Sequence, residues 1–210
     1  MENDTAVVTV FAEYGSGVPA ATATTYGEPM TPHCSACGAV LPSRPPVCCP
    51  ACGTEHWRNA KPCAGVLATD GDNRLLLLRR ATDPWAGRWD IPGGFCDGDE
   101  HPIETAVREA REETGFEVEV TGFLGLWLDH YPDPAEPDDP KTTLNAYYCA
   151  TVGAEVGSPD HETTELGWFA PDALPPEIAF PHHAEAVLAA WREAVREGRT
   201  VTPLPDRPNG

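Results

Sequence analysis

Between residues 61 and 198, hydrophobic and polar positions follow two different repeats. Apolar runs at Ala64–Thr69 and Arg74–Arg80 flank the turn residues Asp-Gly-Asp-Asn, a pattern typical of a β-hairpin. Shorter runs with the composition of strands follow at 117–120, 123–130, 143–152 and 165–169. The acidic and proline-rich segment 132–141 predicts an exposed loop between two of these strands.

Two other stretches repeat apolar residues every three or four positions, as one face of a helix does. In the first, 102–114, these residues are Ile103, Ala106, Val107 and Ala110. Pro102 suits the first helical position and Gly115 the residue after the helix. The second helix is predicted at about 183–197. Mixed strands with helices packed on them indicate a layered α/β sandwich.

The ends of the chain lack such repeats. Residues 1–30 are rich in Ala, Thr, Gly and Pro, with one candidate strand at Val7–Phe11, and 199–210 has a similar composition. We expect both segments to be flexible. With 210 residues, of which 41% are hydrophobic, the chain is long enough for one sizeable core and a small appendage.

The charge restricts the partners. A formal net charge of -19 arises from 33 acidic and 14 basic residues, which disfavours long nucleic acids and anionic membranes as partners. A small phosphorylated molecule that arrives with a divalent cation remains compatible with this charge. The sequence has no basic segment followed by an apolar run at its start, and no apolar stretch of the ~18 residues that a membrane span needs. We therefore expect a cytoplasmic protein, and we leave open whether it forms a homodimer.

Four of the eight cysteines form two C-x2-C pairs, Cys34 with Cys37 and Cys49 with Cys52. Two such turns can close a tetrahedral Zn²⁺ site that is structural because it leaves no open position. The zinc would hold together residues 31–58, which have almost no hydrophobic core of their own. A redox dithiol is the alternative, although a doubled pair at this spacing favours zinc.

Other residues near these pairs are candidates for substitute zinc ligands. They are Cys48, His33 and His56. Cys48 is the strongest of the three because it is adjacent to Cys49 in the sequence.

Three glutamates lie within five residues of the first predicted helix: Glu109, Glu112 and Glu113. Positions i, i+3 and i+4 share one helix face, so these carboxylates repel each other by roughly 0.2–0.5 kcal/mol a pair. Either water or a cation must compensate for the repulsion. A solvated helix face and a metal site are therefore the two interpretations.

The flanking residues favour the metal site. The segment 94–115 fits the pattern G-x5-E-x7-R-E-x-x-E-E-x-G, with Gly94, Glu100, Arg108, Glu109, Glu112, Glu113 and Gly115 at its fixed positions. This resembles the signature of the Nudix hydrolases, which cleave a nucleoside diphosphate linked to another moiety. The resemblance covers roughly 61–198. It implies an α+β fold, a Nudix α/β/α sandwich with a mixed β-sheet, here preceded by a zinc ribbon at 31–58.

The resemblance also implies roles for these residues. Glu109, Glu112 and Glu113 would bind Mg²⁺ or Mn²⁺, which prefer carboxylate oxygens, and one of them would act as general base. Arg108 would pair with Glu100 to fix the loop, and it would offset part of the negative charge.

Two further features belong to the expected metal site. Gly93 and Gly94 would let the loop backbone approach the helix and the ligand closely. Family members often take one more carboxylate from a later loop. We favour Glu162 for this role over Glu165, which begins the next predicted strand.

Substrate recognition is less well defined. Arg80 is a candidate phosphate ligand, with Arg79 its neighbour, and the candidates for stacking on a base are Trp127, Tyr131 and Phe180. Structural ion pairs and core packing are the alternatives for these residues.

A ribbon joined to this domain resembles the NADH pyrophosphatase-like and ADP-ribose pyrophosphatase-like groups. The S-Q-P-W-P-F-P stretch of zinc-ribbon NADH pyrophosphatases is missing, so we favour ADP-ribose or a similar derivative, with NADH or NAD⁺ as the alternative substrate. A non-catalytic nucleotide-sensing regulator is a second alternative. Such regulators usually have an eroded signature and a basic DNA-binding module, and this sequence shows neither.

Overall fold

The computed structural model describes residues 32–133 and 136–197. The elements in chain order are β1 Val47–Cys48, β2 Glu55–His56, β3 Lys61–Thr69, β4 Leu75–Arg80, β5 Trp89–Asp90, β6 Gly93–Phe95, α1 Pro102–Thr114, β7 Phe116–Asp133, β8 Glu136–Glu155, β9 Thr163–Phe169 and α2 Pro181–Glu197. The candidate strand Val7–Phe11 and the two predicted flexible segments, 1–30 and 199–210, lie outside these residues.

Seven strands form one mixed sheet. Its main order is β5-β4-β3-β8-β7, and β6 pairs with β3 while β9 pairs with β4. The central pair, β3 and β8, is parallel, and the other pairs are antiparallel. The predicted hairpin turn is confirmed, because the Asp70 carboxylate accepts the backbone N–H groups of Asp72 and Arg74.

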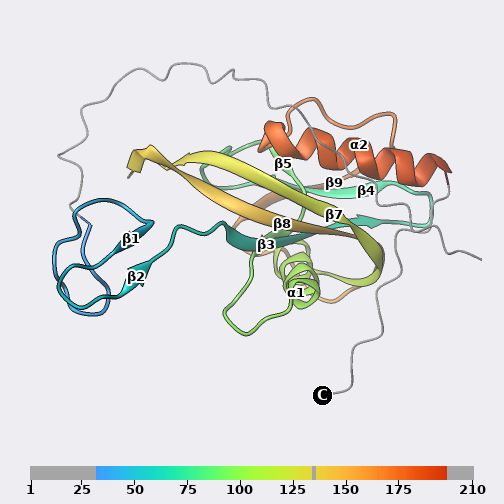
Figure 1. The fold of residues 1–210 in the computed structure, drawn as a ribbon. Coiled ribbons are helices and arrows are strands. Elements are labelled where there is room, and N and C mark those ends of the chain that lie inside the picture. Colours follow the sequence, from blue (N-terminus) through green and yellow to red (C-terminus); the bar gives the residue numbers. More distant parts are fainter. Residues whose placement is uncertain (1–31, 134–135, 198–210) are drawn as a thin grey trace, which may run out of the picture. The chain divides into compact units, whose positions relative to one another are not determined.

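One helix covers each face of the sheet, α1 on one side and α2 on the other (Figure 1). The alternation of side chains along β3 explains this arrangement. Val66 packs in the cluster that contains Ala106 and Ala110 of α1, whereas Leu67 packs in the cluster that contains Val187 and Trp191 of α2. The predicted α/β/α sandwich is therefore confirmed.

The prediction of an exposed loop at 132–141 is wrong, because β7 and β8 continue through most of it as an antiparallel pair. The separate strands predicted at 117–120 and 123–130 are likewise one strand, interrupted by register shifts between Val120 and Gly122 and between Phe123 and Gly125. Pairing of β8 with β3 begins only at Thr143. Among the described residues, 136–142 of β8 pair with β7 alone. This part of the hairpin therefore has two open edges, where prolines that lack an N–H are tolerated.

The cysteine segment folds as two similar turns and a short hairpin. Each C-x2-C turn closes through a glycine with a left-handed backbone: Gly38 donates to the Cys34 carbonyl, and Gly53 donates to the Cys49 carbonyl. Strands β1 and β2 pair next to the second turn. Cys34, Leu41 and Cys49 form its small buried cluster, which is too little apolar surface to hold the segment by packing alone.

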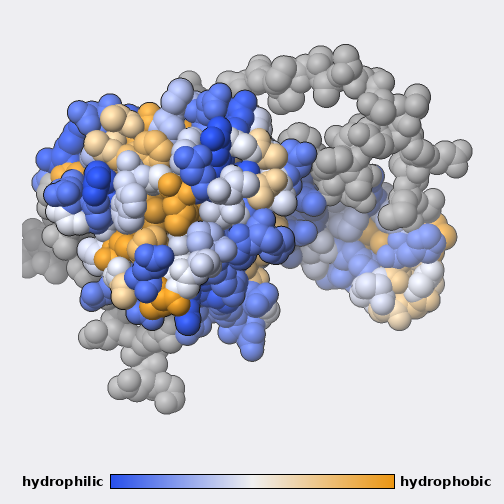
Figure 2. Space-filling model, turned by 180° about the vertical axis from the view of Figure 1, so that it is seen from behind, coloured by the Kyte–Doolittle hydropathy of each residue, from blue (hydrophilic) through white to orange (hydrophobic). Residues whose placement is uncertain are grey.

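Hydrophilic residues cover most of the face in Figure 2, and hydrophobic residues form separate groups between them. Within the part of the chain that the structure describes, no helix has the length and hydrophobicity needed to cross a membrane.

Candidate functional site

Helix α1 begins and ends as the sequence predicts. Pro102 occupies its first position, and the preceding His101 and Glu104 bond reciprocally at its N-terminus. Gly115 ends the helix with a left-handed backbone (φ 75°), and its N–H donates to the Arg111 carbonyl at 2.9 Å. These ends fix where each turn of α1 meets the loop before it.

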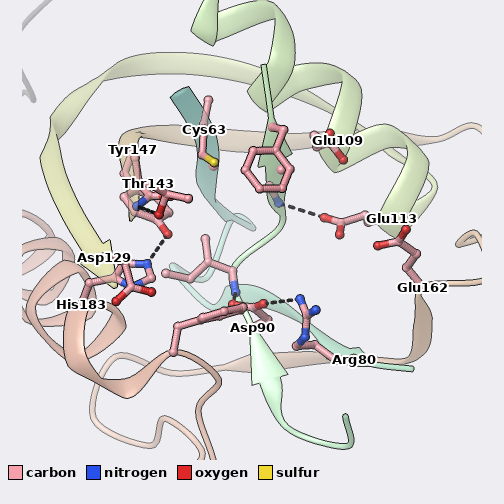
Figure 3. A pocket seen from close by; sticks show the side chains of 18 of the residues that line it. Cys63, Arg80, Asp90, Glu109, Glu113, Asp129, Thr143, Tyr147, Glu162 and His183 are labelled. Carbon is pink, nitrogen blue, oxygen red and sulfur yellow. Dashed lines mark hydrogen bonds and ion pairs between the residues drawn. The ribbon is translucent and has the colours of Figure 1, made fainter. Parts of the chain in front are cut away.

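A cavity of about 530 Å³ opens between α1, the sheet and the start of α2. Of the predicted metal ligands, Glu109, Glu113 and Glu162 line it. Figure 3 shows these three side chains together on one side of the cavity. They come from two turns of α1 and from the loop before β9.

Glu113 is the most buried of the three, with 6% exposure. Its carboxylate accepts the Gly93 N–H at 2.8 Å. Burial raises the pKa of Glu113 to about 9, and the nearby carboxylates of Asp90, Glu109 and Glu162 add to the effect. Burial also raises the pKa of Glu109. A cation is the natural means of keeping both groups ionised.

The two loop glycines pack closely against their surroundings. A Cβ at Gly94 would lie 2.5 Å from a carboxylate oxygen of Glu109, and a Cβ at Gly93 would collide with the backbone of Ala64 and Gly65. Side chains at these positions would therefore displace either the sheet or Glu109.

Arg108 connects the loop to the glutamates. Its Nε and Nη2 donate to the two carboxylate oxygens of Glu100 at 2.8 and 2.9 Å, and Nη1 donates to Glu109 at 2.9 Å and to Glu112 at 3.0 Å. The hydrogen bonds from Arg108 lower the pKa of Glu100 to about 2. The contacts agree with both expected roles, fixing the loop and offsetting the negative charge.

Glu112 lies apart from the other glutamates. Its side chain is 52% exposed and is not among the residues that line the cavity. It lines a second, outer groove together with Arg111 and Val156. The structure thus brings together three of the four predicted ligands and places Glu112 beside them, joined through Arg108.

The backbone fixes the position of Glu162. Its carbonyl accepts the Ala81 N–H at 2.7 Å, and its N–H donates to Asp160, whose own N–H donates to the Glu112 carbonyl at the end of α1. The rival Glu165 lies within β9 and pairs with Arg79 at 3.1 Å. Of the two, only Glu162 lines the cavity.

The proposed substrate residues divide into two groups. Arg80 and Phe180 line the cavity, with the Arg80 guanidinium 5.1 Å from the Phe180 ring centroid. Arg80 also pairs with Asp90 at 2.9 Å. Trp127 instead packs against Tyr147 beside the core and does not line the cavity. The side chain of Tyr131 lies outside the described part of the structure.

Sequence reasoning missed the polar residues on the opposite side of the cavity. They are Asp129, Thr143, Asn145, Tyr147 and His183. The sequence could have indicated those on β7 and β8, because they lie an even number of residues from Trp127 and Tyr147, which face inward, and so share their face of the sheet.

The four predicted zinc ligands form one cluster. The sulfur atoms of Cys34, Cys37, Cys49 and Cys52 lie within 4.8 Å of one another. Two of these distances, Cys34 to Cys52 and Cys37 to Cys49, are 3.6 and 3.7 Å. A tetrahedron with Zn–S bonds of about 2.3 Å has edges of about 3.8 Å, so the spacing fits zinc.

The three candidate substitute ligands lie outside the cluster. The Cys48 thiol contacts the Gly53 carbonyl at 3.5 Å. His33 forms an isolated bridge with Val40. His56 Nε2 lies 3.3 Å from the Cys34 sulfur.

Comparison with known proteins identifies the fold that carries this site. The model of the NUDIX domain family matches residues 60–190. The chain belongs to the Nudix family. The Nudix hydrolase structure from Nitrosomonas europaea superposes with a TM-score of 0.63 at 26% identity, over 81% of this chain and 95% of that one.

Two curated relatives have names that refer to different substrates of their own. The ADP-ribose pyrophosphatase of Methanocaldococcus jannaschii is 32% identical over 124 residues, which cover 56% of this chain and 68% of that protein. The NAD-capped RNA hydrolase NudC of Pseudomonas aeruginosa is 30% identical over 128 residues, 61% of this chain. The matched region spans only 42% of NudC, less than half of its length.

Proposed function

We propose that this Nudix protein hydrolyses the diphosphate of a nucleoside diphosphate linked to another moiety, with ADP-ribose or a similar derivative as the preferred substrate. The observation that carries the proposal is the convergence of Glu109, Glu113 and Glu162 on one cavity, beside a loop whose Gly94 closely approaches the Glu109 carboxylate. Glu109 and Glu113 are largely buried, so their neighbouring carboxylates need a cation, and a diphosphate brings one.

Glu109, Glu113 and Glu162 would hold Mg²⁺ or Mn²⁺, with Glu112 at their margin. The bound metal supplies electrostatic stabilisation of the charge that develops on the phosphates. The chain itself contributes the orientation. Arg108 holds the Glu109 carboxylate, and the Gly93 N–H holds that of Glu113. One of the carboxylates accepts the proton of the attacking water as general base.

The four cysteines would bind one Zn²⁺ as a structural ion. Support comes from the sulfur distances and from the small apolar cluster of the segment. The zinc would have no part in the reaction, since four thiolates leave no coordination position for a substrate.

A nucleotide panel tests the activity. Purified protein with Mg²⁺ should release phosphorylated products from ADP-ribose, and EDTA should abolish the release. No turnover of any diphosphate derivative, with a folded protein and Mg²⁺ or Mn²⁺ present, would contradict the proposal.

NADH or NAD⁺ is the second candidate substrate, because the match to NudC of Stutzerimonas stutzeri, at 27% identity, covers 87% of this chain and so extends beyond the Nudix domain. Capped RNA, which the name of that relative includes, is disfavoured by the net charge of -19. We expect kcat/KM for ADP-ribose to exceed that for NADH, the ratio being the measure of discrimination. Parallel assays at matched Mg²⁺ decide between them, and a clear preference for NADH would reverse the assignment.

A further inference from the structure

Buried polar side chains face the glutamates across the cavity (Figure 3). We call this group the polar wall; its members are Asp129, Thr143, Asn145, Tyr147 and His183. Each is between 4% and 8% exposed. The cavity therefore has carboxylates for metal and phosphate on one side and a different set of polar groups on the other.

Three elements build the polar wall. Asp129 on β7 lies directly opposite Thr143 on β8. Asn145 and Tyr147 follow Thr143 at every second residue and so share its face of the sheet. His183 comes from the first turn of α2. The wall is thus part of the rigid sheet and its covering helix, where positions are held accurately.

His183 contacts two other members of this wall. Its Nδ1 lies 3.1 Å from an Asp129 carboxylate oxygen, and its Nε2 lies 2.8 Å from the Tyr147 hydroxyl. Its ring also stacks on the Tyr147 ring, with centroids 5.9 Å apart. The hydrogen bond at Nε2 and the ring stacking orient the imidazole, and its Nδ1 atom lies against the Asp129 carboxylate without a hydrogen bond.

Such a group is costly in a protein core. A buried carboxylate or amide destabilises the fold unless it is hydrogen-bonded, as Asn145 is to the Trp127 carbonyl and the Thr143 hydroxyl. Apolar side chains of similar size would avoid that cost altogether. Tyr147 itself belongs to the hydrophobic cluster beneath the cavity, where the other members are mostly aliphatic. Polar side chains at the surface of a cavity beside this cluster favour contact with a ligand.

The chemistry of the wall fits hydroxyl groups. Asp129 only accepts hydrogen bonds, whereas the Lys141 ammonium, which also lines the cavity, only donates them. A sugar hydroxyl both donates and accepts, so it can satisfy either. A phosphate would meet the Asp129 carboxylate at close range and is disfavoured there.

We propose that the polar wall binds the sugar hydroxyls of the substrate, with Asp129 as the accepting group and His183 and Tyr147 as positioning residues. This inference rests on the proposed hydrolysis of a nucleoside diphosphate derivative. ADP-ribose has one ribose on each side of its diphosphate. Either ribose would present the same chemistry to the wall, so the test must distinguish them.

The test measures kcat and KM of the parent protein and of Asp129→Asn on three substrates with Mg²⁺. The substrates are ADP-ribose, the β-methyl ester of ADP, which keeps a substituted diphosphate but lacks the distal ribose, and an ADP-ribose analogue with 2′,3′-dideoxyadenosine. For ADP-ribose we expect kcat/KM to fall about 10- to 100-fold, mainly through KM, as for the loss of a hydrogen bond to a charged group.

The pattern across substrates identifies the ribose. If the wall binds the distal ribose, Asp129→Asn lowers kcat/KM for ADP-ribose and the dideoxy analogue but lowers that for the methyl ester far less. If it binds the nucleoside ribose, kcat/KM falls equally for ADP-ribose and the methyl ester, and the dideoxy analogue, already a poor substrate of the parent, loses little more. An equal loss on all three substrates would mean a structural role and would overturn the proposal.

Matched variants keep the test informative. Glu119→Gln makes the same kind of charge change at an exposed position of β7 and should match the parent. If Asp129→Asn does not fold, Thr143→Val is assayed on the same three substrates, and Thr143→Ser should keep the parent activity because it keeps the hydroxyl. Because the Thr143 hydroxyl also accepts a hydrogen bond from Asn145 at 3.0 Å, only an unequal loss across the substrates supports the sugar contact. Loss in the Ser variant equal to that in the Val variant would contradict a hydroxyl contact.

Titration calorimetry in EDTA separates this proposal from the hydrolytic one. Even without turnover, the parent should bind ADP-ribose and Asp129→Asn should bind it about 10-fold more weakly or worse. Equal affinities would overturn the sugar site while leaving the proposed hydrolysis to its own assay. If the affinity depends on Asp129 but no substrate is hydrolysed, the sugar site is supported and the proposed hydrolysis is overturned.

Discussion

The cysteine cluster and the glutamate cluster are two candidate metal sites of opposite kinds. The four cysteine sulfur atoms lie within 4.8 Å of one another, and Gly38 and Gly53 close the two matching turns that carry them. Such a cluster has room for a single ion and no substrate. The carboxylates of Glu109, Glu113 and Glu162 instead border a cavity of about 530 Å³. The comparison indicates that a metal site with all its positions filled by protein ligands serves stability, whereas a site that borders a cavity leaves room for a substrate and can serve catalysis.

Removing a carboxylate from the open site should have the largest effect on activity. We expect Glu113→Gln to lower kcat about 10²- to 10⁴-fold, because it removes a metal ligand or the general base. Circular dichroism should be unchanged, since the amide still accepts the Gly93 N–H. Activity within a few-fold of the parent would remove Glu113 from the proposed site.

Crowding the open site should have the next largest effect. A Cβ in Gly94→Ala would lie 2.5 Å from a Glu109 carboxylate oxygen, so we expect kcat to fall by up to about 100-fold through displacement of that group. Gly98→Ala is the matched control, because a Cβ there meets no atom within 4 Å. Similar losses in both variants would show that the loop, and not the contact with Glu109, sets the activity.

Glu112 should matter less than Glu113. Its half-exposed carboxylate contacts Arg108 outside the cavity, so we expect Glu112→Gln to lower kcat by about 10-fold, as for a residue that orients a ligand. Steady-state kinetics on the two variants side by side give the comparison. A loss as large as that of Glu113→Gln would show that Glu112 turns inward to bind metal with the substrate.

The closed site should have the smallest effect on activity. We expect Cys49→Ser, at a fully buried ligand position, to reduce the zinc content from about one ion per chain to nearly none and to unfold the ribbon. Hydrolysis should change little. Elemental analysis and activity assays check both outcomes, with Cys48→Ser as control because its thiol lies outside the cluster. Zinc loss in the control would show that the ligand set is wrong.

Local signals predicted the parts of the molecule that are local in sequence. Pro102 and Gly115 mark the ends of α1, and the cysteine pairs mark their own turns. The continuation of β7 and β8 through 132–141 was not predicted, because pairing between strands overrode a composition typical of loops. Propensity describes a single segment and contains no information about its partner.

The site was predictable on one side only. Glu109 and Glu113 lie one turn apart in a single helix, so their spacing alone places them on a common face, whereas Glu112 turns toward the outer groove. Asp129, Tyr147 and His183 come from three elements and meet only after the sheet and α2 have packed. Each looks like an ordinary strand or helix residue by itself. Their meeting is a property of topology, which no short pattern contains.

The contacts of Arg108 decide whether a lysine could replace it. Its planar guanidinium sends separate N–H groups to Glu100, Glu109 and Glu112, and a further one to the Phe95 carbonyl at 3.3 Å. A lysine would carry the same charge on a single rotating ammonium with three donors, and it cannot span these acceptors in the same way. Equal charge is therefore no guide to equivalence at this position; the shape of the cation decides.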